Sequence, residues 1–138
     1  MILIHELSHV YSPGTVFEKK ALDHVDLKIE DGEILGIIGH TGSGKSTLIQ
    51  HLNGLLKPTE GAVYFNGEDI HDKDFSMKKL RSKIGLVFQY PEHQLFESTV
   101  IEDVQFGPKN MGLDPLEMEM RSFEALKQVG MGEEYLDV

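Results

Sequence analysis

A glycine-rich stretch between residues 39 and 47, GHTGSGKST, holds the residues of this sequence best suited to chemistry. Gly39, Gly42 and Gly44 let the backbone curl so that several N–H groups point inward, where side chains would obstruct them. Such a cradle attracts an oxyanion, and the positive end of a following helix strengthens the attraction. The lysine and serine after the last glycine are placed to contact a phosphate and a divalent cation.

The spacing of this stretch matches the pattern G-x-x-x-x-G-K-[ST] in full. Lys45 can reach the terminal phosphates of a nucleotide, the Ser46 hydroxyl can bind Mg2+, which prefers oxygen ligands, and Thr47 offers a further donor. The sequence therefore predicts a site for a nucleotide with Mg2+, formed by Gly39, His40, Thr41, Gly42, Ser43, Gly44, Lys45, Ser46 and Thr47. The alternative is a strand-to-helix turn without a ligand.

The segments around the stretch are those that position such a loop. The apolar run from Glu33 to Gly39 predicts a strand buried on both faces, and residues 45–56 predict a helix with an apolar stripe. Upstream, apolar and charged residues alternate between Val25 and Glu30, which predicts a half-buried strand. We also expect a strand at 2–11, a hairpin around Asn66-Gly67, a short helix at 76–83, a second buried strand at 84–88, and helices beginning at Thr99 and Pro115. In the last helix, Met118 and Met120 are expected to fill core space rather than form a binding surface.

Composition narrows the classes of function. The chain has 138 residues, 40% of them hydrophobic, which suits one domain with a real core. A net charge of −10 argues against binding to nucleic acid, and the lack of cysteine excludes disulfides and thiolate chemistry. No apolar run is long enough to cross a bilayer, and the N-terminus lacks the pattern of a signal peptide, so we expect the chain in the cytosol. The seven histidines are scattered and are expected to be solvated or locally bonded rather than metal ligands; His5 and His9 are expected on one face of the first strand.

Two segments resemble a known family. Residues 9–70 resemble the N-terminal half of an ABC-type transporter ATPase, in which an aromatic residue of the first strand stacks on adenine; Tyr11 holds that position. Residues 85–112 resemble the Q-loop region of the energy-coupling factor subfamily, which drives vitamin and transition-metal importers. There the glutamine that matches Gln89 contacts Mg2+ and the attacking water and senses the membrane subunit. The plainer alternatives are a packed strand tyrosine and a polar residue that ends a strand.

The resemblance implies a fold, a domain plan and partners. The fold is α/β, a P-loop NTPase fold of the ABC ATPase type, with a parallel core sheet and an antiparallel β region. Residues 1–138 would be the N-terminal portion of one such domain, with a nucleotide-binding core at 1–97 and the start of a helical subdomain at 98–138. It implies ATP and Mg2+ as ligands, Lys45 and Gln89 as catalytic residues, and Ser46 and Gln89 as metal contacts. It also implies a second ATPase subunit and membrane subunits for coupling and substrate binding, at the cytoplasmic face of the cell membrane.

The same resemblance implies residues that this sequence lacks. An LSGGQ-type signature, an apolar strand ending in Asp-Glu and a later switch histidine are all missing, as in roughly the first half of a longer protein. We therefore expect negligible ATP hydrolysis by these 138 residues alone, and self-association or marginal stability. Tyr90, His93, Leu95 and Phe96 are expected to contact a membrane subunit, the alternative being packing against their own helix. Other functions left open are a P-loop kinase or small NTPase, another ABC-type ATPase, and a non-catalytic nucleotide-binding module.

Overall fold

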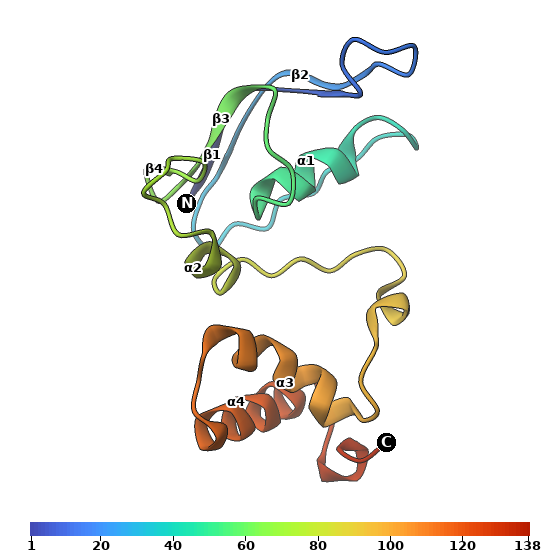
Figure 1. Cartoon of the computed structure of the whole chain (residues 1–138), viewed down its shortest axis with the longest axis vertical. Helices are drawn as coiled ribbons and strands as arrows, with labels where there is room; N and C mark the ends of the chain where they lie inside the picture. The colour runs from blue at the N-terminus through green and yellow to red at the C-terminus, as the bar shows by residue number, and fades with distance from the viewer. The chain divides into compact units, whose positions relative to one another are not determined.

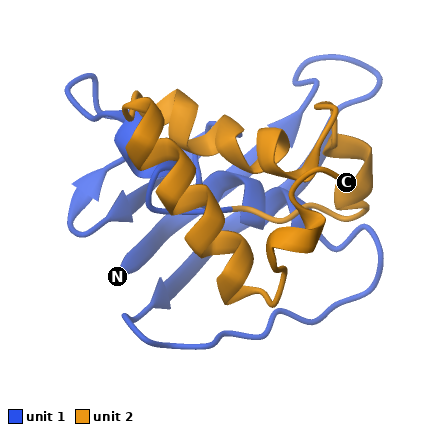
Figure 2. Ribbon diagram, turned by 90° about the horizontal axis from the view of Figure 1, so that it is seen from below, with its two compact units in different colours: residues 1–85 blue, residues 86–138 orange.

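The chain folds into two compact units, Met1–Gly85 and Leu86–Val138, in a computed structural model that describes all residues from 1 to 138 (Figures 1 and 2). The first unit contains β1 (Ile2–Tyr11), β2 (Lys19–Ile29), α1 (Lys45–Leu52), β3 (Glu60–Phe65), β4 (Glu68–Asp69) and α2 (Met77–Arg81). The second contains α3 (Val100–Met111), α4 (Pro115–Gln128) and the short 3-10 helices η1 (Pro91–Gln94) and η2 (Glu133–Tyr135). The functional boundary expected after residue 97 stays a prediction.

The strands form one antiparallel sheet in the order β2-β1-β3-β4. β1 lies in the middle, where Ile4 pairs with Leu27 of β2 on one side and with Val63 of β3 on the other. The hairpin predicted at Asn66-Gly67 is present, with φ of 49° and 85° at these two residues. Both angles lie in the left-handed region that a tight two-residue hairpin turn requires.

A bulge in β1 changes which side chains face the core. Ile4 and Leu7 are three residues apart yet both are buried, because the register with β2 shifts between them and Glu6 takes a φ of 48°. The same shift separates two histidines. His5 is largely exposed beside Asp26, whereas His9 is buried. The expectation that His5 and His9 share one face was wrong, because strict alternation holds only in a strand without a bulge.

The core of the first unit lies between the sheet and its two helices. Its buried members are Ile4, Leu7, Leu22, Leu48, Val63, Ile70 and Leu80. α1 contributes Leu48 and α2 contributes Leu80, so both predicted helices are confirmed and both are held by burial. Full burial of such an aliphatic side chain stabilises a fold by roughly 1.5–3 kcal/mol.

Neither apolar segment predicted to be a buried parallel strand forms a strand in this structure. Residues 33–38 and 84–88 carry no regular secondary structure, and Ile34, Ile38 and Val87 are 98%, 96% and 84% exposed. A strand needs a neighbour to accept and donate its backbone hydrogen bonds, and a strand apolar on both faces needs cover on both. No residue of this chain pairs with either segment. The antiparallel and helical parts of the predicted fold are confirmed, and the exposure expected for residues 33–38 is confirmed with them.

The second unit is built on two capped helices. The Thr99 hydroxyl accepts from the Glu102 N–H (3.4 Å), which is the N-cap bond of the predicted capping box, and donates to the Glu102 carboxylate (3.0 Å) in place of the backbone bond that completes the box. α4 begins at Pro115, as predicted. Met118 is half-buried but Met120 is 61% exposed, so Met120 does not fill core space. None of the helices combines the length and the apolar character needed to cross a membrane.

Candidate functional site

The loop at residues 39–47 leads directly into α1. Gly42 and Gly44 have φ of 84° and 101°, a left-handed conformation that brings the chain round to the first turn of the helix. No side chain caps the N-terminus of α1, and its first turn holds no acidic residue. The first N–H groups of a helix have no partner within it, so the start of α1 carries unpaired donors and partial positive charge.

Two glycines of the loop, Gly39 and Gly44, lie where a Cβ would make a close contact, and Gly44 also has a positive φ. A Cβ on Gly39 would lie 2.7 Å from the Ser43 hydroxyl oxygen. A Cβ on Gly44 would lie 2.6 Å from the Ala21 carbonyl oxygen of β2, closer than real Cβ atoms approach. At Gly44 the loop is therefore packed against the backbone of β2 in a way that only glycine permits, whereas the contact at Gly39 is with the side chain of Ser43.

Lys45 supplies the positive charge of the site. Its ammonium donates to the carbonyls of Gly39 (2.6 Å) and His40 (2.8 Å) and to the Ser43 hydroxyl (3.3 Å), so it folds back over the loop. An anion at the start of α1 would meet this ammonium and the helix N–H groups together. Ser46 is exposed beside them, where its hydroxyl is accessible to a cation.

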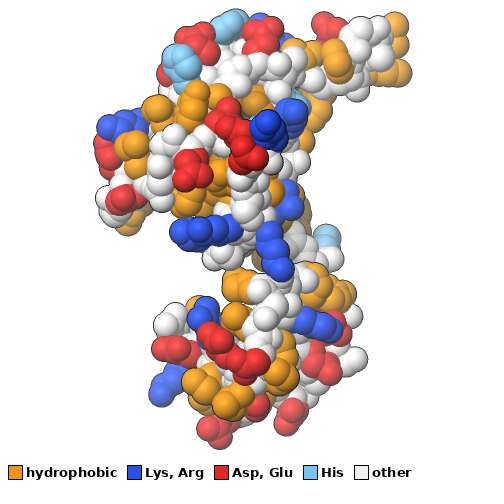
Figure 3. Space-filling model, turned by 60° about the vertical axis from the view of Figure 1, so that its left-hand side comes forward, with side chains coloured by type: hydrophobic (Ala, Val, Ile, Leu, Met, Phe, Trp, Pro, Cys, Tyr) orange, Lys and Arg blue, Asp and Glu red, His pale blue; other side chains and the backbone are white.

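The face of the chain seen in Figure 3 has no broad basic surface. Acidic and basic side chains are interspersed on the face seen in Figure 3, with hydrophobic side chains between them. The net charge is −10, so the positive character at the loop is local and comes from Lys45 and the helix start. Anion binding there depends on geometry rather than on the overall field.

The structure brings Tyr11 to the loop. Its hydroxyl lies 3.1 Å from the Thr47 hydroxyl, in the first turn of α1, although 36 residues separate the two in the chain. Tyr11 is 38% exposed, which leaves part of the residue open to a ligand. Both residues are predicted from the sequence to bind the nucleotide, and their contact supports placing them in one site. Base stacking by Tyr11 stays a prediction.

Two histidines that sequence reasoning left outside the site lie behind Tyr11. The His9 ring packs edge-to-face against Tyr11 (centroids 4.7 Å apart) and against His51 (4.8 Å). His51 is fully buried, and its Nδ1 donates to the Thr47 carbonyl over 2.7 Å. Burial lowers the pKa of His51, so the neutral ring is favoured. His9 and His51 are locally bonded, which is one of the two expected alternatives, and they are not solvated. The i, i+4 spacing of Thr47 and His51 is the sequence signal that could have predicted the bond between them.

Gln89 belongs to the second unit, whereas the loop belongs to the first. It is exposed on an irregular segment just before η1. Among the neighbouring residues proposed for contact with a partner, Tyr90 stacks on His93 (5.9 Å) and Phe96 packs edge-to-face on Phe106 of α3 (4.9 Å). The catalytic and metal roles assigned to Gln89 stay predictions.

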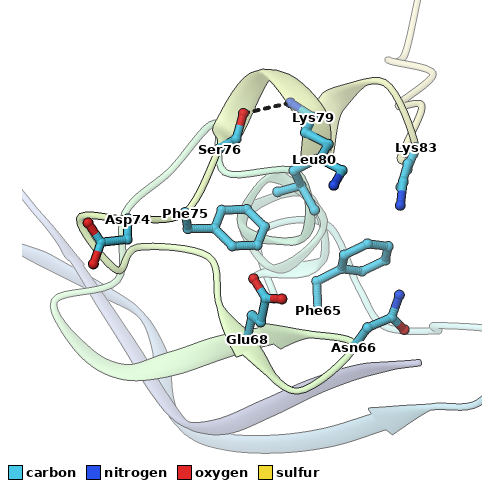
Figure 4. A pocket seen from close by; sticks show the side chains of 9 residues that line it. All are labelled: Phe65, Asn66, Glu68, Asp74, Phe75, Ser76, Lys79, Leu80 and Lys83. Carbon is cyan, nitrogen blue, oxygen red and sulfur yellow. Dashed lines mark hydrogen bonds between the residues drawn. The ribbon is translucent and has the colours of Figure 1, made fainter.

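A cavity in the first unit lies away from the loop. It measures about 230 Å³ and is shown in Figure 4, with the rings of Phe65 and Phe75 beneath Leu80 and two lysines at its edge. Its lining residues are Phe65, Asn66, Glu68, Asp74, Phe75, Ser76, Lys79, Leu80 and Lys83. Phosphate binding by a glycine-rich loop uses exposed backbone N–H groups and needs no deep cavity, so the loop remains the candidate site.

Comparison with known proteins defines the class to which this fold and loop belong. The model of the family described as "ABC transporter" matches residues 22–137, and the chain belongs to this family. The dimeric post-hydrolysis structure of an ATP-binding cassette bound to ADP and Pi covers 99% of the chain and 60% of its own, with a TM-score of 0.79 and 30% identity. The predicted ABC ATPase fold is thereby confirmed.

More similar relatives are named more narrowly. The energy-coupling factor transporter ATP-binding protein EcfA2 of Clostridium acetobutylicum is 57% identical over 99% of the chain, and the EcfA2 of Symbiobacterium thermophilum is 58% identical over 94%. The solved structure of cbiO1 from Clostridium perfringens, titled as part of the ABC transporter complex cbiONQ, shares 42% identity over 99% of the chain and 52% of its own, with a TM-score of 0.78. The chain spans 47% and 45% of the two EcfA2 relatives, about half their length.

Proposed function

We propose that this chain is the nucleotide-binding portion of an ATP-binding subunit in an energy-coupling factor importer. The observation that carries the proposal is the loop at 39–47, with Lys45 folded over it and an uncapped helix start behind it. The similarity to the EcfA2 relatives supports the importer assignment. In this proposal, ATP binding and hydrolysis by the complete protein drive uptake of a vitamin or a transition-metal ion at the cytoplasmic face of the membrane.

The residues present fit Mg-ATP. The N–H groups at the start of α1 and the Lys45 ammonium would hold the phosphates, and the exposed Ser46 hydroxyl would hold Mg2+. Tyr11 would contact the base from the side of the loop that Thr47 occupies. Mg2+ would neutralise charge on the phosphates, and Gln89 would help to orient the attacking water. A second ATPase subunit would complete the site.

The direct test is calorimetric titration of Mg-ATP into the full-length protein. Lys45→Ala should weaken binding about 10- to 100-fold, because a hydrogen bond between charged groups is worth roughly 1.5–3 kcal/mol. Lys28→Ala is the matched control, since it removes the same charge from an exposed residue of β2 that pairs with Glu30. No heat with the unaltered protein, or equal weakening by both variants, would overturn the proposal.

ATP hydrolysis should distinguish residues 1–138 from the full-length protein. The 138 residues should turn over ATP negligibly, because they supply phosphate contacts and Gln89 but no general base after an acidic strand. The full-length protein should hydrolyse ATP. Turnover by residues 1–138 at the rate of the full-length protein would contradict this division, and the nucleotide sequence beyond codon 138 would show directly whether a signature and an Asp-Glu strand follow.

The segment after Gln89 supports a contact with a membrane subunit. Tyr90, Leu95 and Phe96 are 59%, 68% and 61% exposed, an unusual share of large apolar side chains for one surface loop. Phe96 also packs on Phe106, so the two explanations for this segment differ in what its loss would do. Phe96→Ala should lower transport while leaving ATP binding unchanged if the contact exists. Equal loss of transport and ATP binding would favour internal packing instead.

A further inference from the structure

A closed circuit of contacts among Tyr11, His9, His51 and Thr47 links β1 to the start of α1. The Tyr11 ring packs edge-to-face on His9, His9 packs edge-to-face on His51, and the circuit returns through Thr47. Thr47 makes two of these contacts: its carbonyl accepts from His51 Nδ1 (2.7 Å), and its hydroxyl lies 3.1 Å from the Tyr11 hydroxyl. The ring positions and the first turn of α1 are therefore fixed relative to each other.

The polar rings of this circuit are buried at a cost. His9 is 9% exposed and His51 is fully buried, and His51 Nε2 has no hydrogen-bond partner. A buried polar atom without a partner destabilises a fold, and a leucine at the same position would avoid that cost. His9 is further tethered, because its Nδ1 lies 3.2 Å from the Lys57 carbonyl. A stack of this kind is more directional than an aliphatic contact, since edge-to-face rings prefer a defined angle.

We propose that His9 and His51 are positioning residues that hold the Tyr11 ring in place beside the 39–47 loop, so that it can contact the base of a bound nucleotide. His51 is fixed by the Thr47 carbonyl, His9 rests on His51, and Tyr11 rests on His9. Neither histidine is among the groups proposed to hold the phosphates, which are Lys45 and the N–H groups at the start of α1. The two histidines should therefore affect binding of the base, which meets Tyr11, and not binding of the phosphates. This inference rests on the proposed function of the loop as a nucleotide site.

The test compares two ligands that share the phosphates but not the base. Mg-ATP and inorganic tripolyphosphate with Mg2+ are titrated into the full-length protein and its variants. His9→Leu should weaken ATP binding about two- to tenfold, the range of one edge-to-face ring pair, and leave tripolyphosphate binding unchanged. His9→Phe keeps an aromatic ring and should retain most of the ATP affinity. His5→Leu is the control, because His5 lies on the same strand but is exposed beside Asp26.

A second comparison tests whether the effect passes through Tyr11. In a Tyr11→Leu background, His9→Leu should cause no further loss of ATP affinity, since the ring it positions is gone. Full additivity of the two changes would overturn the inference. Equal weakening of ATP and tripolyphosphate by His9→Leu would also overturn it, because general disruption of the loop affects both ligands. If the unaltered protein binds neither ligand, the proposed function fails, and this inference fails with it.

Discussion

Gly44→Ala tests how the loop is packed against β2. Gly44 has a φ of 101°, and a Cβ there would lie 2.6 Å from the Ala21 carbonyl oxygen and 3.2 Å from a Leu22 methyl group. The left-handed conformation costs an alanine about 1–2 kcal/mol. The contact with backbone adds roughly 1–3 kcal/mol, because the carbonyl belongs to a paired strand and cannot move freely.

Gly42→Ala separates these two costs. Gly42 has a φ of 84°, but a Cβ there would meet nothing within 4 Å. Gly42→Ala should therefore lower the free energy of unfolding only by the conformational cost of about 1–2 kcal/mol. In both variants, the reduced entropy of the unfolded chain offsets roughly 0.4–1 kcal/mol of this loss. The difference between the variants isolates the contact with Ala21, and we expect Gly44→Ala to be less stable than Gly42→Ala by about 1–3 kcal/mol.

Urea unfolding of the full-length protein and both variants, followed by circular dichroism, measures this difference. Nucleotide binding gives a second readout, because relief of the Gly44 contact would shift the N–H groups at the start of α1. Equal stability of the two variants would refute the reasoning, since it would mean that the loop does not lie against β2 as described.

Three further predictions concern the core, pH and a helix cap. Leu80→Ala should destabilise the first unit by about 2–5 kcal/mol, because Leu80 is 1% exposed, whereas Leu116→Ala, at a 67% exposed position, should cost well under that in the same urea titration. The free energy of unfolding should fall as the pH drops below 6.5, because burial lowers the pKa of His51 in the folded protein. Below that pH the imidazole is protonated in the unfolded chain but stays neutral in the folded chain, which favours unfolding. The slope from this residue is at most about 1.4 kcal/mol per pH unit, and His51→Leu should reduce the total slope without removing it, because burial also lowers the pKa of His71. An unchanged slope would assign the dependence to groups other than His51. Thr99→Ala should lower the stability of α3 by about 1 kcal/mol in unfolding followed by circular dichroism, while Ser98→Ala, one residue before the cap, should not.

Local structure was predictable where the signals lie within a few residues. The hairpin at Asn66-Gly67 depends on two positive φ values that asparagine and glycine tolerate, and the start of α3 depends on a threonine and a glutamate three residues apart. The loop at 39–47 is of the same kind, because its glycine spacing sets the turn into α1. The sequence signals for these features lie within a few residues of one another.

Pairing between distant segments was not predictable in the same way. Residues 33–38 and 84–88 have the composition of buried strands, but a strand exists only with neighbours, and these residues have none within the chain. Composition describes what a segment can bury, not whether another segment is present to cover it. The high exposure of Ile34 and Ile38 is the measurable result.

The sequence by itself determined the chemistry available at the site: the glycines, Lys45 and Ser46 are adjacent in the chain, and short-range backbone geometry brings them together. Only the tertiary structure decided which residues pack next to the loop at the start of α1. A bulge in β1 turns His9 inward and away from the exposed side that His5 occupies, and α1 then places His51 and Thr47 against it. The physical reason is that a bulge shifts side-chain alternation by one residue, and its position depends on pairing with β2 and β3 rather than on the residues of β1 alone.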